Sequence, residues 1–402
     1  MTTKLKVALA GIALAVVAAT ANAQPYYPQY YPGSGYPYPL GWTASRHLVP
    51  KFGRQNTNWR PSMSEIKRIA IDTSKAVFTL HGVDDAGRPM LRRNVRRREP
   101  VPFFEKLPPV EVVLEACGGS HHWGRALSTI GHRVRLLPAQ YVKPFVKRSK
   151  NDRNDAEAIS VAASQPSISS VPIKSLEQQA AAMLLSVREL LVRQRTQLVN
   201  ALRGHAAELG MVAPLGEKGL AELRTEIAAA DERAVPAAAK QALMLLGQET
   251  HRIETRLAAI EVKLMQQHRA NPVSRRLSGI PGVGPIGALN FALRIDPAQF
   301  RSARHLAAWL GLVPRECSTA GRQRLGGISR AGDERLRQLL VLGATAVIRH
   351  AKPGRPATSP WLLSLLGRKP RKLAAVALAN KMARIIWAMM TSGQAYRSQP
   401  AA

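Results

Sequence analysis

Residues 110–115 read Val110-Glu-Val-Val-Leu-Glu115, and this stretch decides how the first part of the chain folds. A short run rich in valine and leucine favours a strand buried at the centre of a sheet. Glu115 directly follows the apolar run, so its carboxylate is expected to emerge where the strand ends. The stretch therefore predicts a central strand with an acidic group at its carboxyl end.

Apolar runs on both sides of this strand predict a mixed sheet. Further strands are expected at Ile69–Ile71, Val77–Leu80, Met90–Val95 and Arg133–Leu137. A polar turn at Asp84–Gly87 joins the second to the third, and a helix over Trp123–Ile130 precedes the last. Periodicity by itself establishes an α/β domain, and the order of the elements matches the ribonuclease-H-like plan.

Leucine spacing predicts two long helices in the middle of the chain. The apolar positions recur every three, four or seven residues, at Leu184, Val187, Leu191, Leu198 and Leu202, and again at Leu246, Ile253, Leu257, Ile260 and Leu264. We expect them to pair as an antiparallel or intermolecular coiled coil, which is a spacer or dimer arm. The alanine-rich segment Ala228–Lys240 is a candidate hinge.

The rest of the chain, from Leu277, is expected to form a compact helical domain. Asp333–Val347 and Leu373–Met390 have the pattern of amphipathic helices, and Gly393 stands where the second should stop.

The charge of the chain points to a polyanionic partner. The formal net charge is +32, which exceeds what solubility requires, while 46% apolar residues are enough to build cores. Nucleic acid is the first candidate, because the basic residues are spread through segments with globular patterning rather than gathered beside one apolar helix, as a membrane partner would favour. The two cysteines offer no disulfide framework and no zinc spacing.

The first 62 residues differ in character from the rest. Residues 1–23 have the basic start, apolar run and Ala21-Asn-Ala23 ending of a secretory leader, and residues 24–62 include a Tyr/Pro/Gly stretch that favours disorder. Met63 begins a segment that leads directly into the first strand. We interpret residues 1–62 as derived from another gene, with the functional protein starting at Met63. A cytoplasmic, nucleoid-associated protein is expected; true secretion is the alternative.

Four acidic residues stand where a sheet protein can place a metal site. Asp72 ends the first strand, Glu115 ends the central strand, and Asp152 and Asp155 lie one turn apart at the start of an expected helix. Carboxylates that converge repel one another unless cations hold them together. Mg²⁺ prefers such oxygen ligands, and two ions roughly 4 Å apart can stabilise both the attacking and leaving oxygens of a phosphodiester.

Each acid also has a structural interpretation. Asp152 and Asp155 suit the first turn of any helix, and Asp72 can cap a turn. The order Asp, Glu, Asp-x-x-Asp, with every member at a strand end or helix start, favours the metal site. His121 and His122 follow Glu115, and we treat them as phosphate-facing or incidental.

The segment from Gly311 to Gly332 alternates small, hydroxyl and basic residues around Ser318. Such a loop lets backbone approach a phosphate closely, and its arginines, Arg315, Arg322, Arg324 and Arg330, can bind the phosphate oxygens. Ser318 can then attack phosphorus and hold a DNA end covalently without ATP. A passive phosphate clamp is the alternative.

The glycine-rich segment 278–287 carries Gly282, Gly284 and Gly287 in Gly-x-Gly-x-x-Gly spacing. A dinucleotide fold is disfavoured, because no strand precedes the segment and Pro281 and Pro285 interrupt it. A helix-hairpin-helix that donates its amides to a DNA backbone, with Gly282 and Gly284 in the hairpin, fits better.

Taken together, these segments resemble a known family. From Met63 to about Tyr396 the chain resembles the bridge-RNA-guided insertion-sequence transposases of the one-hundred-and-ten group. The resemblance rests on the following short motifs in this order: Ile71-Asp-Thr-Ser-Lys75, Leu114-Glu-Ala-Cys-Gly118, Lys150-Asn-Asp-Arg-Asn-Asp-Ala156, Gly279-Ile-Pro-Gly-Val-Gly284, Ser318-Thr-Ala-Gly-Arg322 and Gly327-Ile-Ser-Arg-Ala-Gly332.

The resemblance implies a Holliday-junction-resolvase-like domain over 63–170, whose DEDD metal site is Asp72, Glu115, Asp152 and Asp155. It implies a coiled-coil region over 171–270, a transposase domain over 271–396 and a tail over 397–402. A serine that links covalently to DNA maps to Ser318, with Thr319 as the neighbouring alternative. The family also implies a guide RNA, and a homo-oligomer, dimer or tetramer, is expected.

Two other functions compete with this one. A metal-only junction nuclease would leave Ser318 a bystander, and a basic DNA-binding protein without catalytic activity would need none of the acids.

Overall fold

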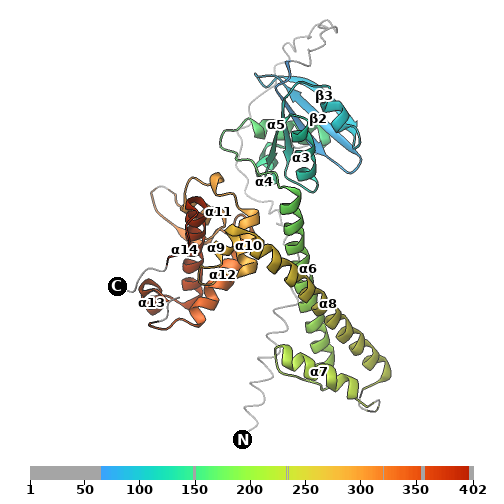
Figure 1. Cartoon of the computed structure of the whole chain (residues 1–402), viewed down its shortest axis with the longest axis vertical. Coiled ribbons are helices and arrows are strands. Elements are labelled where there is room, and N and C mark those ends of the chain that lie inside the picture. The colour runs from blue at the N-terminus through green and yellow to red at the C-terminus, as the bar shows by residue number, and fades with distance from the viewer. Residues whose placement is uncertain are drawn as a thin grey trace, which may run out of the picture. The chain divides into compact units, whose positions relative to one another are not determined.

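The computed structural model describes residues 65–147, 151–231, 233, 235–319, 321–354 and 358–397. The leader-like segment and the start at Met63 lie outside these residues, so the interpretation of residues 1–62 stays a prediction. Among the described residues the first part is a mixed α/β domain and the last part is mainly helical (Figure 1).

Five strands form one mixed sheet. They are β1 (Arg68–Thr73), β2 (Val77–Val83), β3 (Pro89–Arg96), β4 (Glu111–Glu115) and β5 (Arg133–Leu137), in the spatial order β3-β2-β1-β4-β5. The first three are joined antiparallel, whereas β4 runs parallel to both β1 and β5. The predicted mixed sheet is therefore confirmed, with strand ends within a few residues of those expected.

Helices cover both faces of this sheet. On one face, α2 (Pro100–Phe104) and α3 (Ser120–Thr129) bury Phe104, Trp123 and Leu127 against alternate strand residues such as Ile69 and Ile71. On the other, α5 (Asp152–Ala163) packs its Ile159 and Ala162 on Ala70 and Val113, beside α4 (Ala139–Val142) and a 3-10 turn at Lys143–Phe145. Since strand side chains alternate between faces, each strand residue has a defined side.

The middle of the chain contains α6 (Leu176–Glu208), α7 (Glu217–Ala229) and α8 (Ala237–Ala270). Ion pairs join Arg188 to Glu261 and Arg195 to Glu254, so α6 and α8 run antiparallel. The short α7 was not predicted, and the candidate hinge runs from the last two residues of α7 into the start of α8. Val187, expected in the seam, is 39% exposed.

The last part contains α9 (Pro272–Leu277), α10 (Pro285–Arg294), a 3-10 turn at Pro297–Gln299, α11 (Ala303–Trp309), α12 (Glu334–Arg349), α13 (Pro360–Arg368) and α14 (Arg371–Ser392). The predicted helical domain is confirmed for most of this part, which also contains an unpredicted two-stranded sheet of β6 (Pro314–Glu316) and β7 (Leu325–Ile328). Leu325-Gly-Gly-Ile328 has no helical periodicity, and its backbone pairs with β6 instead. Gly393 ends α14 in the left-handed conformation, as predicted.

Among the described residues, α14 alone is long and apolar enough to cross a membrane. One side of this helix, which includes Ala379, Met382 and Ile386, is instead buried in the core of the last domain. The helix is therefore accounted for as a core helix.

Candidate metal centre and serine loop

Three of the four predicted metal ligands converge in the fold. Asp72, Asp152 and Asp155 each present a carboxylate oxygen, and these oxygens all lie within 4.8 Å of one another. Glu115 is not part of that tight group, although its charge acts on Asp72 and the charge of Asp155 acts on it. The four acids thus form one electrostatic cluster with three members in direct proximity.

Strand alternation and helix docking together bring the acids to one place. Ile71 and Leu114 are register partners in the parallel β1–β4 pair, so the next residues, Asp72 and Glu115, leave the sheet side by side. Both alternate onto the face that α5 covers, because Ala70 and Val113 pack against that helix. Asp152 and Asp155 occupy its first turn.

The cluster carries unfavourable charge when no cation is present. The pKa of Asp72 is raised to about 6, first because the carboxyl is half-buried and then because Asp155, Asp152 and Glu115 repel its charge. Burial and the charge of Asp155 also raise the pKa of Glu115. Oxygen donors that repel one another in this way suit a divalent cation.

Polar contacts fix α5 at both ends. At its start the Asn151 side chain accepts a hydrogen bond of 2.9 Å from the backbone N–H of Asn154. At its end the Arg68 guanidinium donates to the Ser164 hydroxyl at 2.7 Å, and Arg135 donates to the carbonyl oxygen of Ala163 at 3.2 Å. Acids at the start and arginines at the end both complement the helix dipole.

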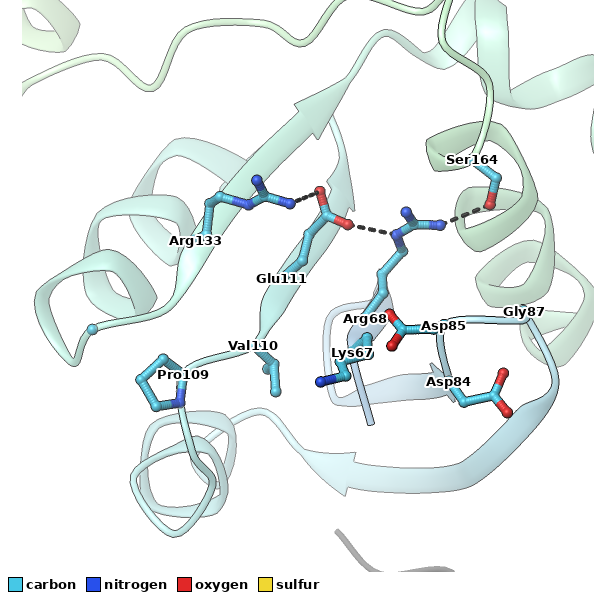
Figure 2. Close-up of a pocket in the computed structure, with 11 residues that line it drawn as sticks. Lys67, Arg68, Asp84, Asp85, Gly87, Pro109, Val110, Glu111, Arg133 and Ser164 are labelled. Carbon is cyan, nitrogen blue, oxygen red and sulfur yellow. Dashed lines mark hydrogen bonds and ion pairs between the residues drawn. The ribbon is translucent and has the colours of Figure 1, made fainter. Parts of the chain in front are cut away.

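Glu111 connects the arginines at that end of the sheet. Its carboxylate contacts Arg68 at 2.7 Å, Arg133 at 3.0 Å and Arg135 at 3.1 Å, and Figure 2 shows the chain of contacts from Arg133 to Ser164. Burial alone would raise the pKa of Glu111, but the hydrogen bonds and charges of these arginines lower it overall. The cavity beside it, of about 660 Å³, lies at the amino ends of the parallel strands, opposite the metal-ligand candidates.

Ser318 lies in the connection between β6 and β7. Its hydroxyl donates a hydrogen bond of 2.9 Å to Oε1 of Glu316 and accepts one of 3.1 Å from the backbone N–H of Arg324. A carboxylate can take a proton from the hydroxyl, and an N–H can stabilise the oxygen that remains. Sequence analysis did not single out Glu316; its position two residues before Ser318 at the end of a strand is the signal that could have found it.

The four arginines predicted around this serine are all exposed. Arg315 is in β6, Arg322 and Arg324 follow Ser318 in the connection, and Arg330 follows β7. Arg330 is the one described non-glycine residue with a positive φ, at 56°. No hydrogen bond or ion pair occupies these four guanidinium groups within the described part of the chain, so they are available to a ligand.

The glycine-rich segment connects α9 to α10, and Gly282 and Gly284 are both exposed there. Gly282 has a φ of +86° and lies against Gly343 of α12; a Cβ built on Gly343 would be 2.0 Å from the Gly282 carbonyl oxygen. Gly343 was missed by sequence analysis, because a single glycine inside a helix carries no signal of its partner.

The two histidines that follow Glu115 in the sequence both contact other residues of the protein. His121 accepts a hydrogen bond from the Lys174 backbone N–H at 3.3 Å, and His122 packs edge-on against Trp123. Cys117 and Cys317 are both exposed free thiols, so neither is a core residue.

Two family profiles match the chain. A DEDD-type transposase profile covers residues 69–210, which include all four acids, and the profile described as the transposase IS116/IS110/IS902 family covers residues 274–358, which include Ser318.

Several curated proteins are similar over most of their length. A putative transposase of Sinorhizobium fredii is 52% identical over 340 residues, covering 84% of this chain and 87% of that protein. A probable family 20 transposase of Pseudomonas aeruginosa is 45% identical, covering 83% and 99%. The transposase for insertion sequence element IS1111A of Coxiella burnetii is 40% identical, covering 84% and 93%.

Proposed function

Because the chain belongs to the IS116/IS110/IS902 family of DEDD transposases, which cleave and rejoin DNA, we propose that it moves an insertion sequence by using its acidic cluster together with Ser318. The observation that carries this proposal is the convergence of Asp72, Asp152 and Asp155, with Glu115 beside them.

The acidic cluster is proposed to hold Mg²⁺. Three carboxylate oxygens within 4.8 Å of one another are hard ligands that would hold such a cation, and Glu115, whose charge acts on Asp72, would be the fourth member of the set. When bound, Mg²⁺ neutralises charge that develops on the oxygens of a phosphodiester in the transition state. Asp72 and Glu115 act from the rigid sheet, and Asp152 and Asp155 act from a helix held at both ends.

Ser318 is proposed as the nucleophile. Its hydroxyl proton passes to Glu316 as the serine oxygen bonds to phosphorus, and the bond from phosphorus to one DNA oxygen breaks. That oxygen leaves as a DNA hydroxyl after taking up a proton. The phosphoserine keeps the bond energy, so attack by the hydroxyl of another DNA end rejoins the DNA and frees the serine without ATP. Thr319 is the neighbouring alternative to Ser318.

DNA contacts are proposed at two further places in the last domain. The exposed guanidinium groups of Arg315, Arg322, Arg324 and Arg330 suit the phosphate oxygens near Ser318. The segment with Gly282 and Gly284 is proposed as a helix-hairpin-helix that binds the DNA backbone without regard to sequence.

The remaining assignments follow from the family and the pattern of the chain. We place a DEDD domain at 63–170, an arm at 171–270 and a transposase domain at 271–396. The arm has exposed apolar residues, including Met183 at 61% and Val262 at 60%, which support its use for dimerisation. A guide RNA from the element and a cytoplasmic location are proposed with it.

A covalent-adduct assay tests the proposed function. Purified protein is incubated with labelled DNA of the element's end, any required RNA and Mg²⁺, and DNA-linked protein is measured on a denaturing gel. The wild type and Thr319→Ala should form the adduct, whereas Ser318→Ala should not. Cleavage that persists in Ser318→Ala, with no adduct in any variant, would instead identify a metal-only nuclease.

A further inference from the structure

A second cavity, of about 310 Å³, lies beside the acidic cluster over β2 and β3. Its lining includes Thr79, His81, Arg92 and Asn94 from these strands, and Arg153 from α5. Thr79 is the register partner of Asp72, and Asn94 is the register partner of Thr79. The cavity therefore begins one strand away from the acid on β1.

Strand alternation separates the side chains that face this cavity from those that do not. Residues paired across strands share a face, so Thr79 and Asn94 lie on the same face as Asp72. Arg93, which also borders the cavity, alternates to the opposite face, where its guanidinium lies over the Phe103 ring at 5.2 Å from the centroid. We call the polar set Thr79, His81, Arg92, Asn94 and Arg153 the Thr79 cavity.

Two buried polar side chains in the Thr79 cavity lack hydrogen-bond partners. Thr79 is 5% exposed and His81 is 4% exposed, and neither side chain is hydrogen-bonded to any residue that the structure describes. Arg153 likewise makes no hydrogen bond or ion pair within the described ranges. Thr79 and His81 are not among the residues whose polar atoms are sealed off without a partner, so their polar atoms reach the cavity and are accessible to a ligand there.

The charge of the Thr79 cavity favours an anion. None of the described residues that line it is acidic, and the carboxylate whose charge acts on His81 is that of Glu157 in α5. Arg92 reaches Glu157 at 3.5 Å, but Lys147 contacts the same carboxylate at 2.6 Å, so one negative charge faces two positive ones. Arg153 adds a further positive charge from the helix turn that carries Asp152 and Asp155.

We propose that the Thr79 cavity binds one phosphodiester group of the DNA strand that is cut at the acidic cluster. The hydroxyl of Thr79 and the guanidinium groups of Arg92 and Arg153 donate to its oxygens, while the sheet fixes their distance from Asp72. Neighbouring strands are about 4.8 Å apart and a DNA strand rises about 3.4 Å per nucleotide, so this phosphate lies within a few nucleotides of the cut. The cavity would thus position the strand for cleavage, and this inference rests on the proposed function.

The geometry favours DNA over the guide RNA as the ligand. The cavity shares a sheet face and helix α5 with the acids, and under the proposed function the strand held at the acids is DNA. A phosphate bound here lies on the path of that strand.

A double-mutant cycle tests the proposal without requiring cleavage. Thr79→Val removes one hydroxyl at constant shape, and Arg153→Gln removes an exposed charge that has no partner to lose among the described residues. Each should weaken binding of the full chain to a fluorescent single DNA strand about tenfold. Arg153→Gln should also reduce the salt dependence of binding by roughly one phosphate contact. The double variant should lose less than the product of the two effects, because both groups bind one phosphate.

Arg93→Gln is the matched control, because it removes the same charge from the neighbouring position on the opposite face. It should leave the affinity loss caused by Thr79→Val unchanged. Fully additive losses, or an equal effect of Arg93→Gln and Arg153→Gln, would overturn the proposal. Losses confined to an RNA strand of the same sequence would overturn the assignment to DNA. Because this assay measures DNA binding and not adduct formation, its outcome does not depend on whether Ser318 is the nucleophile.

Discussion

Asp72 on β1 and Asp155 in the first turn of α5 present carboxylate oxygens within 4.8 Å of each other. Each side chain is held by a different constraint: Asp72 by the register of the sheet, and Asp155 by a helix whose two ends are both fixed. Their charges therefore cannot separate easily, and the cluster should respond to pH and to cations.

Asp72→Asn is expected to stabilise the metal-free protein above pH 6. The pKa of Asp72 is raised from 3.8 to about 6 by burial and by its acidic neighbours, so the folded state favours the protonated form. The contribution of Asp72 to the free energy of unfolding is therefore fully present below pH 3.8, and it is lost as the pH rises through about 6. Above pH 6 the ionised Asp72 lowers the free energy of unfolding by about 1–2 kcal/mol, a figure that includes solvent screening of a half-exposed group.

Urea unfolding in the presence of a chelator, at pH 4 and pH 8, measures this effect. The gain in the free energy of unfolding should be present at pH 8 and absent at pH 4, and Asp72→Asn should also lose Mg²⁺ binding by calorimetry. Asp85→Asn, at an exposed acid outside the cluster, is the control. Equal stability of wild type and Asp72→Asn at pH 8 would show that the cluster is not strained.

Glu316→Gln is expected to slow formation of the Ser318–DNA adduct about 100-fold. Glutamine can still accept the hydrogen bond from Ser318, but it cannot take the proton. Rapid-quench measurement of the adduct, with Glu334→Gln as a control at another exposed acid, provides the comparison. An adduct rate unchanged in Glu316→Gln would assign proton removal to another group.

Glu111→Gln is expected to lower the free energy of unfolding by about 2–3 kcal/mol, because Arg68, Arg133 and Arg135 would remain together without their shared carboxylate. The lowered pKa of Glu111 means that its contribution is present above pH 4.5 and is lost as the pH falls below that value. The difference between wild type and variant should therefore shrink in acid. Urea unfolding at pH 7 and pH 3.5 tests this, and a difference that persists in acid would contradict it.

Gly343→Ala is expected to destabilise the last domain by about 3 kcal/mol, because its methyl group would overlap the Gly282 carbonyl oxygen. Gly284→Ala is the control, since a Cβ there meets nothing within 4 Å and its φ is −75°. Thermal unfolding of the two variants should differ clearly. Similar melting temperatures would mean that α12 and the glycine-rich segment separate without cost.

Local patterns in the sequence were enough to predict the sheet and to identify the four acids as candidate metal ligands. Strands and helices follow from the spacing of apolar residues, and Asp72 and Glu115 stand directly after such runs. Local patterns did not predict β6, β7 or α7, because the two strands are short and exposed and α7 is a short helix between two long ones.

Tertiary structure decided which of these residues meet. Spacing shows that strand residues alternate, but only the packing of Ile159 and Ala162 on Ala70 and Val113 determines that α5 covers the face of Asp72. The contacts of Ser318 with Glu316 and of Gly282 with Gly343 likewise depend on strand pairing and helix docking. Periodicity is a local property of the chain, whereas the choice of face depends on burial between segments far apart in the sequence.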